Sequence, residues 1–191
     1  MPAVGRIVLA LQDVERSPYL STIERLEELD VLVTEPQASH WRAVEAALAH
    51  VGDEPTVLLH EANRPLLPVA GLTALIGMAV EHEASMLAIP MHDSVKRVAN
   101  GRVLCTVPRE TLHISQTPTV FKSHVLVAAV KRALREGWAV RNEVELALAA
   151  GVDLRLVEGQ RFNVPIVSAL DAAYAEVSGR LGRLVPTLSG V

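Results

Sequence analysis

Residues 6–36 read RIVLALQDVERSPYLSTIERLEELDVLVTEP, and this stretch decides the fold class. It opens with RIVLAL at 6–11, a continuous apolar run that is typical of a strand covered on both faces. YLSTIERLEEL at 19–29 then places leucine and isoleucine at helical spacing, and DVLVTEP at 30–36 returns to a strand pattern that ends in proline. A strand, a helix and a second strand of these lengths predict a β-α-β unit.

The same alternation continues toward the C-terminus. The patterns predict helices at 40–50, about 69–83, about 122–136, about 141–150 and after Ser168, and strands at 56–60, 85–90 and 153–159. We therefore expect an α/β fold, a three-layer sandwich with a mostly parallel, Rossmann-like sheet, in one domain over residues 1–191.

One segment departs from this alternation. Between His92 and Pro118, short polar and β-prone pieces surround the Asn100-Gly101 pair, which is a strong signal for a tight hairpin turn. This pattern predicts a β arm at about 92–118 that protrudes from the sheet.

Helix ends are marked by capping residues. Gly137 and Gly151 stand where helices should stop, and Ser168 with Asp171 three residues on forms a start of the capping-box kind. We expect the last helix to pack through an apolar face of four residues, Leu170, Ala173, Tyr174 and Val177.

Composition narrows the range of functions. The 18 basic and 22 acidic residues give a formal charge of -4 without a basic cluster, so a nucleic-acid partner is not expected. The chain has one cysteine, Cys105, which excludes an internal disulfide framework. No apolar run reaches the length that spans a membrane and no signal peptide is apparent, so we expect a cytoplasmic protein without a membrane partner.

The segments after the strands are where a ligand site is expected, because ligands of open α/β sheets sit beyond the carboxyl ends of the strands. These segments follow Leu11, Val33, His60, Pro90 and Val157. The richest is HEANRP at 60–65, where a carboxylate could hold a metal on a nucleotide and an arginine could bind phosphate. Glu61 and Arg64 could equally do no more than cap neighbouring helices.

HEANRP resembles the HDAARP signature of 2-C-methyl-D-erythritol 4-phosphate cytidylyltransferases, which follows the same strand. Further segments match that family in the same order: HDSVKRV at 92–98, SQTPTVF at 115–121, NEVELAL at 142–148 and LVEGQRFNVPI at 156–166. Arg109 lies eight residues before Thr117, at the spacing of the family's arm arginine.

The resemblance implies an activity and a set of residues. Family members transfer a cytidylyl group from CTP to methylerythritol phosphate, with Mg²⁺, in the non-mevalonate route to isoprenoids. The positions that match imply acceptor-phosphate binding by Arg64, Lys96, Arg109 and Thr117, and metal binding by Glu61. Mg²⁺ is expected only if a nucleotide binds. The resemblance also implies a homodimer joined through the arms, or a heteromer with an active paralogue.

Several positions depart from the family pattern. The first strand is followed by QDVERSP at 12–18 rather than by a glycine-rich, triphosphate-binding loop, and PQASHWRAV at 36–44 lacks the family's second glycine pair. Phe162 stands where an acidic residue is expected, and Pro165 where the family has lysine. We expect a catalytically impaired member that acts by association or ligand binding. An active cytidylyltransferase and a sugar-phosphate-binding module are the alternatives.

Overall fold

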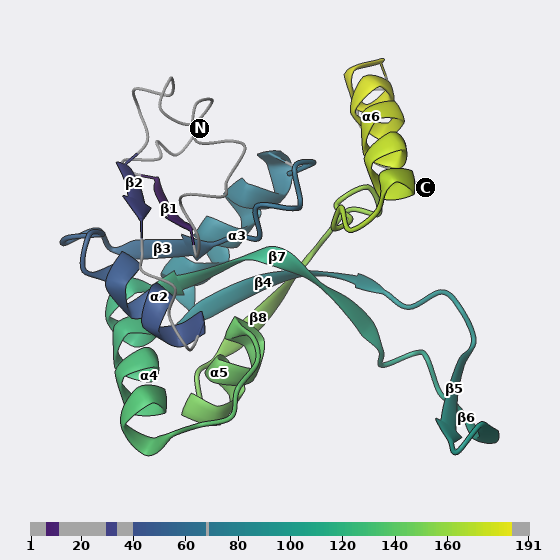
Figure 1. Cartoon of the computed structure of the whole chain (residues 1–191), viewed down its shortest axis with the longest axis horizontal. Coiled ribbons are helices and arrows are strands. Elements are labelled where there is room, and N and C mark those ends of the chain that lie inside the picture. Colours follow the sequence, from purple (N-terminus) through teal and green to yellow (C-terminus); the bar gives the residue numbers. More distant parts are fainter. Residues whose placement is uncertain (1–6, 12–29, 34–39, 68, 185–191) are drawn as a thin grey trace. The chain divides into compact units, whose positions relative to one another are not determined.

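The computed structural model describes residues 7–11, 30–33, 40–67 and 69–184 (Figure 1). The helix expected at 19–29 and the loop at 12–18 lie outside the described residues. The chain forms two compact units, each assembled from separate stretches. The first comprises Met1–Val57, Ala79–Ala84 and Phe121–Leu154, and the second Leu58–Met78, Ser85–Val120 and Arg155–Val191. The single domain expected over 1–191 stays a prediction.

The first unit contains the parallel pair expected from the opening stretch. Strands β1 (Val8–Leu11) and β2 (Asp30–Val33) pair in parallel, with Val8 opposite Asp30. Helix α2 (His40–Leu48) contacts β1 and helix α4 (Ser123–Glu136), and α4 in turn contacts α5 (Glu143–Ala150).

The two helix ends of this unit form as the glycine signals predicted. Gly137 ends α4 at φ 66° and its N–H donates to the carbonyl oxygen of Ala133, and Gly151 ends α5 at φ 75°. Both glycines adopt the left-handed backbone that a side chain would disfavour. Asn142 begins α5 by accepting a hydrogen bond from the Glu145 N–H at 2.9 Å.

The described residues also form a four-stranded sheet. It contains β3 (Thr56–Leu59), β4 (Ala84–Pro90), β7 (His113–Lys122) and β8 (Leu154–Glu158), in the order β3-β7-β4-β8.

Backbone hydrogen bonds give the strand directions. Ala84 pairs with Asp153 and Gly159 with Ala88, so β4 and β8 are parallel. Lys122 pairs with Glu83 and Met91 with Leu112, so β7 runs against β4. The α/β fold with a mostly parallel to mixed sheet is confirmed, with parallel pairs at β1-β2 and β4-β8 and with β7 antiparallel to β4.

The second unit carries the arm. β5 (Val95–Ala99) and β6 (Arg102–Val107) form a separate antiparallel pair, and Figure 1 shows them at the end of the excursion between β4 and β7. The hairpin turn falls at Asn100 and Gly101, with φ of 48° and 75°, as the sequence predicts. On the return path β7 starts at His113, and its residues from Gln116 to Phe121 are buried.

Helices α3 (Val69–Glu81) and α6 (Ala169–Leu184) complete the elements. The capping box of α6 is confirmed, because Asp171 Oδ2 accepts from the Ser168 hydroxyl at 2.7 Å and the Asp171 N–H donates back to Ser168 Oγ at 3.2 Å. The predicted apolar face of α6 is wrong as a packing face. Its four members Leu170, Ala173, Tyr174 and Val177 are exposed, whereas Ala175 is buried. Spacing defines the apolar stripe of a helix, but a neighbouring element must be present to cover it.

Candidate functional site

The loop that follows β3 forms a tight turn closed by its own polar groups. The Arg64 N–H donates to the Glu61 carbonyl oxygen at 3.0 Å, and Arg64 Nε donates to Glu61 Oε2 at 2.5 Å. The Arg64 side chain is 13% exposed and that of Glu61 is 53% exposed. The turn thus holds the arginine close to the protein surface and leaves much of the carboxylate open to solvent.

The Arg64 guanidinium has a second anchor. Its Nη1 donates to the main-chain oxygen of Asn163 at 2.9 Å. Arginine carries five N–H donors in a rigid, planar fork. No hydrogen bond from Nη2 is found among the described residues, so this end of the fork is available to an anionic ligand such as phosphate.

Thr117 on β7 lies beneath this loop and is 6% exposed. Its Oγ1 accepts from the Glu61 N–H at 3.2 Å and lies 3.1 Å from His60 Nδ1. The other ring nitrogen, His60 Nε2, lies 2.9 Å from the Arg64 carbonyl oxygen. His60, Glu61, Arg64 and Thr117 therefore form one hydrogen-bonded cluster, which we call the loop site.

The pKa of His60 lies below its ordinary value of 6.5. Desolvation of the ring is the main cause because burial disfavours the charged imidazolium, and the nearby Arg64 cation acts in the same direction. The hydrogen bond to the Arg64 carbonyl and the Glu61 carboxylate oppose the shift. The burial of the ring therefore favours the neutral form of His60.

Asn163, in the segment after β8, joins the loop site from the other side through its bonds to Arg64 and Thr117. Asn163 is fully buried, and its Nδ2 donates to the Thr117 carbonyl oxygen at 2.8 Å. Gln116 Nε2 donates to the main-chain oxygens of Gln160 and Asn163, at 2.8 and 3.1 Å, and Gln116 Oε1 accepts from the Gln160 N–H at 3.1 Å. Gly159 has no room for a side chain, because an added Cβ would lie 2.1 Å from Gln116 Oε1.

His60, Gln116, Gly159 and Asn163 were not among the candidate residues of the sequence analysis. They stand within the quoted segments, but no pattern of charge or spacing distinguishes them. His60 and Gly159 directly follow the strands β3 and β8, so position could have indicated them, whereas Gln116 lies within β7 and Asn163 in the segment after β8.

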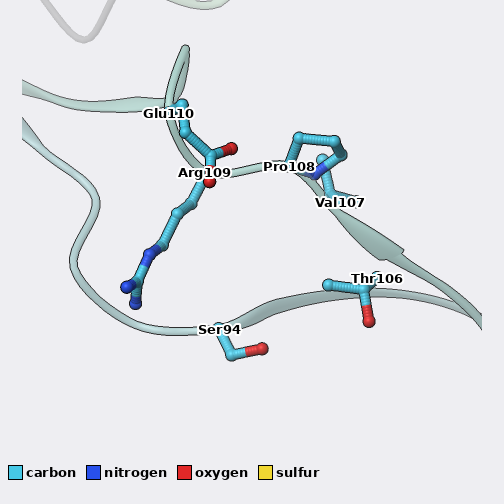
Figure 2. Close-up of a pocket in the computed structure, with 6 residues that line it drawn as sticks. All are labelled: Ser94, Thr106, Val107, Pro108, Arg109 and Glu110. Carbon is cyan, nitrogen blue, oxygen red and sulfur yellow. The ribbon is translucent and has the colours of Figure 1, made fainter.

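Lys96 and Arg109 lie in the arm and outside the loop site. An open pocket of about 290 Å³ is lined there by Ser94, Thr106, Val107, Pro108, Arg109 and Glu110. Figure 2 shows the Arg109 side chain extending toward the segment that leads to Ser94, and Arg109 Nη1 donates to the His92 carbonyl oxygen. Lys96 Nζ donates to Ser94 Oγ at 2.7 Å and to Thr106 Oγ1 at 2.8 Å.

The loop site could contribute one metal ligand. Glu61 Oε2 is paired with Arg64, which leaves Oε1 as its oxygen for a cation. In the described part of the chain, no three His, Cys, Asp or Glu residues are grouped so that they could hold a metal ion. Mg²⁺ is often held by one or two carboxylates together with substrate phosphates, so Glu61 fits Mg²⁺ that arrives with a nucleotide.

The chain matches known proteins over nearly its whole length. The family model described as 2-C-methyl-D-erythritol 4-phosphate cytidylyltransferase matches residues 1–180. The protein of that name from Symbiobacterium thermophilum is 32% identical over 181 residues, which cover 92% of this chain and 74% of the relative. The Vibrio vulnificus protein of the same name is 31% identical over 182 residues, 92% of this chain and 76% of the relative.

Solved structures agree on the fold. The crystal structure of the 2-C-methyl-D-erythritol 4-phosphate cytidylyltransferase from Thermus thermophilus is similar, with a TM-score of 0.77 and 24% identity, over 92% of this chain and 82% of that chain. A structure of 4-diphosphocytidyl-2C-methyl-D-erythritol synthase has a TM-score of 0.80, also at 24% identity, over 93% of this chain and 83% of that chain.

In the part of the chain that the structure describes, no helix has the length and apolar character needed to cross a membrane.

Proposed function

Because this chain belongs to the 2-C-methyl-D-erythritol 4-phosphate cytidylyltransferase family, of the non-mevalonate route to isoprenoids, we propose that it binds a phosphorylated small molecule at Arg64. The observation that carries this proposal is the anchoring of the guanidinium. Glu61 Oε2 and the Asn163 carbonyl oxygen hold it from two directions, while Nη2 remains available. A cation that is already oriented loses less conformational entropy when it binds a phosphate.

The cytidylyl transfer itself is impaired in this proposal. Transfer between phosphates depends on groups that neutralise the charge that develops in the transition state. Phe162, which is 36% exposed, and Pro165 stand where the family pattern has an acidic residue and a lysine. Neither side chain can bind a metal ion or a phosphate, so this segment supplies less of that neutralisation.

An active transferase is the second candidate. In that reaction an oxygen of the acceptor phosphate attacks the α-phosphorus of CTP, and the bond to the departing pyrophosphate breaks. The match over residues 1–180 favours this reading, as do the retained Glu61, Arg64, Lys96, Arg109 and Thr117. If a nucleotide binds, Mg²⁺ would reach Glu61 Oε1 with its phosphates and offset their charge.

The arm offers a surface for association, in a homodimer or in a heteromer with an active paralogue. Its apolar side chains Val98, Val103 and Leu104 are 55, 66 and 59% exposed. Apolar groups on an exposed hairpin favour burial against a partner. In such an assembly Arg109 would complete a site on another subunit. A cytoplasmic location stays a prediction.

The ligand proposal is tested by calorimetry with 2-C-methyl-D-erythritol 4-phosphate. We expect saturable binding by the wild-type chain and a loss of at least about tenfold in affinity for Arg64→Ala, because a charge-assisted pair is removed. Arg102→Ala, at an exposed arginine of β6 that lies outside the loop site and does not line the pocket in the arm, is the matched control and should bind normally. Absence of binding by the wild type would refute the proposal.

The same preparation decides between impaired and active enzyme. CTP, Mg²⁺ and methylerythritol phosphate are added, and released pyrophosphate is measured. We expect little or no release. Steady turnover by the isolated chain would establish the active transferase instead. Saturable binding of CTP without turnover would agree with an impaired enzyme, and would show that the chain still has a nucleotide-binding site.

Association through the arm is tested by sedimentation velocity. The wild type should sediment as a dimer when the chain is alone, and Leu104→Lys should shift it toward the monomer. A wild-type monomer that dimerises only with an active family member would establish the heteromer. If Leu104→Lys leaves the assembly unchanged, the arm is not the interface.

A further inference from the structure

The Thr117 hydroxyl is committed to groups of its own chain. The family resemblance suggests that this residue binds the acceptor phosphate. Its Oγ1 instead lies 3.1 Å from His60 Nδ1 and accepts from the Glu61 N–H at 3.2 Å, in a side chain that is 6% exposed. The direction of each of these bonds decides what the hydroxyl can still offer to a ligand.

The direction of the hydrogen bond between Thr117 and His60 Nδ1 follows from the partner of the other ring nitrogen, Nε2. His60 Nε2 lies 2.9 Å from the Arg64 carbonyl oxygen, and a carbonyl oxygen can only accept a hydrogen bond. Nε2 therefore carries the proton. In the neutral ring Nδ1 is then an acceptor, so Thr117 must donate its hydroxyl proton to it. The lowered pKa of His60 agrees with a neutral ring.

The hydroxyl then has no donor left. A threonine hydroxyl has one proton and two lone pairs. The hydroxyl proton makes the hydrogen bond to His60 Nδ1, and one lone pair accepts a hydrogen bond from the Glu61 N–H. The remaining lone pair can only accept, and phosphate oxygens that carry charge are acceptors as well. While the chain of bonds is intact, Thr117 therefore has no proton to donate to a phosphate.

We propose that Thr117 and His60 are positioning residues, which act on the ligand through the Glu61–Arg64 turn and not by touching it. Their hydrogen bonds reach that turn at both ends, at the Glu61 N–H and at the Arg64 carbonyl oxygen. The Glu61–Arg64 turn orients the Arg64 guanidinium through its bond to Glu61 Oε2. The identity of the ligand in this inference rests on the proposed function, whereas the hydrogen-bond directions do not.

The first experiment needs no ligand. Long-range ¹H–¹⁵N correlation spectra of the uniformly labelled full chain at about pH 7.5, where a neutral ring is expected, report which nitrogen of His60 is protonated. We expect the Nε2–H form in the wild type and in Thr117→Ser, which keeps the hydroxyl. In Thr117→Val the Nδ1 resonance should move, because it loses its donor. A wild-type His60 in the Nδ1–H form would overturn the inference.

The second experiment separates positioning from direct contact. Affinity for 2-C-methyl-D-erythritol 4-phosphate is measured for Thr117→Val, His60→Phe and the double variant. Each single change should weaken binding by roughly tenfold, as expected for loss of one hydrogen bond at a buried site. The double variant should bind no worse than either, because both changes break the same chain of bonds.

Controls make the outcome specific. Thr117→Ser should restore binding, and Thr111→Val, at an exposed threonine outside the cluster, should have no effect. Additive losses in the double variant would mean that Thr117 contacts the ligand independently, and would overturn the inference. If the wild type fails to bind the probe, the proposed function fails, and the spectrum of His60 still decides the hydrogen-bond directions on which this inference is built.

Discussion

The loop site and the arm carry the same kinds of side chain in opposite settings. In the loop site Thr117 and Asn163 are buried, Arg64 is nearly so, and hydrogen bonds join residues far apart in sequence. In the arm, Lys96 and Arg109 are exposed, and their bonds stay within the hairpin and its connections. Contacts between distant parts of the chain therefore hold the side chains of the loop site, whereas the side chains of the arm are held by local contacts that are open to solvent.

The difference has a physical cause. A buried polar group that loses its partner costs about 1–3 kcal/mol, whereas an exposed group exchanges its partner for water at little cost. The loop site therefore has its geometry before a ligand arrives. The cations of the arm become effective only where a partner or a ligand excludes water from them.

The largest expected effect comes from placing a charge inside the loop site. Asn163→Asp replaces the donor to the Thr117 carbonyl oxygen by a buried acceptor, and should lower the free energy of unfolding by about 3 kcal/mol at pH 7. The penalty should shrink as the pH falls through the raised pKa of the new carboxyl, since the protonated form donates again. Denaturant titrations at about pH 7 and pH 5 measure this.

The arm provides the matched control. Asn100→Asp lies in the hairpin turn at φ 48°, a backbone that aspartate tolerates, and should change stability by less than about 0.5 kcal/mol. Equal penalties at the two positions would contradict the contrast between the regions.

The next largest loss of stability is expected from a substitution at Gly159. Gly159→Ala brings a Cβ within 2.1 Å of Gln116 Oε1, and Gln116 is buried and held by three hydrogen bonds. Overpacking of this kind should destabilise the protein by about 1–3 kcal/mol. Gly77→Ala, inside α3 where no described residue lies within 4 Å of an added Cβ, should instead stabilise by about 0.5–1 kcal/mol. Thermal unfolding of both variants checks the signs, and a neutral Gly159→Ala would show that Gln116 yields easily.

Arginine-to-lysine exchanges compare the two regions directly. Arg64→Lys cannot reproduce the fork that reaches both Glu61 and the Asn163 carbonyl oxygen, so it should destabilise by about 1–2 kcal/mol. Arg109→Lys in the arm should stay within about 0.5 kcal/mol. Chemical denaturation measures the free energy of unfolding of both variants. Similar losses for Arg64→Lys and Arg109→Lys would contradict the contrast between the loop site and the arm.

His60 predicts a smaller, pH-dependent effect. Its pKa is lowered in the folded state, so the unfolded chain takes up the proton first as the pH falls. The stability of the wild type should therefore decrease from about pH 7 downward through 6.5, the ordinary value, relative to His60→Gln. Melting temperatures of both proteins between about pH 8 and pH 5 test this, and parallel curves would refute it.

The smallest effect belongs to Lys96. Lys96→Ala removes two exposed hydrogen bonds, to Ser94 and Thr106, and should change stability by less than about 0.5 kcal/mol. A loss well above about 1 kcal/mol in the melting analysis would show that the arm has internal order comparable to the loop site.

The sequence alone predicted those parts of the fold that depend on near neighbours. Alternating strand and helix patterns identified the α/β class, and Asn100-Gly101 identified the hairpin of the arm. The caps at Gly137, Gly151 and Ser168 could also be predicted. These signals succeed because turn and cap conformations are decided by residues within about one helical turn.

The sequence also identified part of the loop site. Strand ends and the matching segments indicated Glu61, Arg64 and Thr117, and the structure brings these three together. Lys96 and Arg109 were grouped with them by the same resemblance, and the structure places both in the arm. The resemblance matches positions along the chain, but it does not say which of them meet within one subunit.

Only the tertiary structure decided how the remaining groups act. His60, Gln116 and Asn163 each make a side-chain hydrogen bond across 44 to 57 residues of sequence, a separation over which no local pattern carries information. The apolar stripe of α6 was predicted correctly as a stripe and wrongly as a packing face, for the same reason. A sequence determines which groups a segment can offer, and the fold decides which of them are buried and which partners they meet.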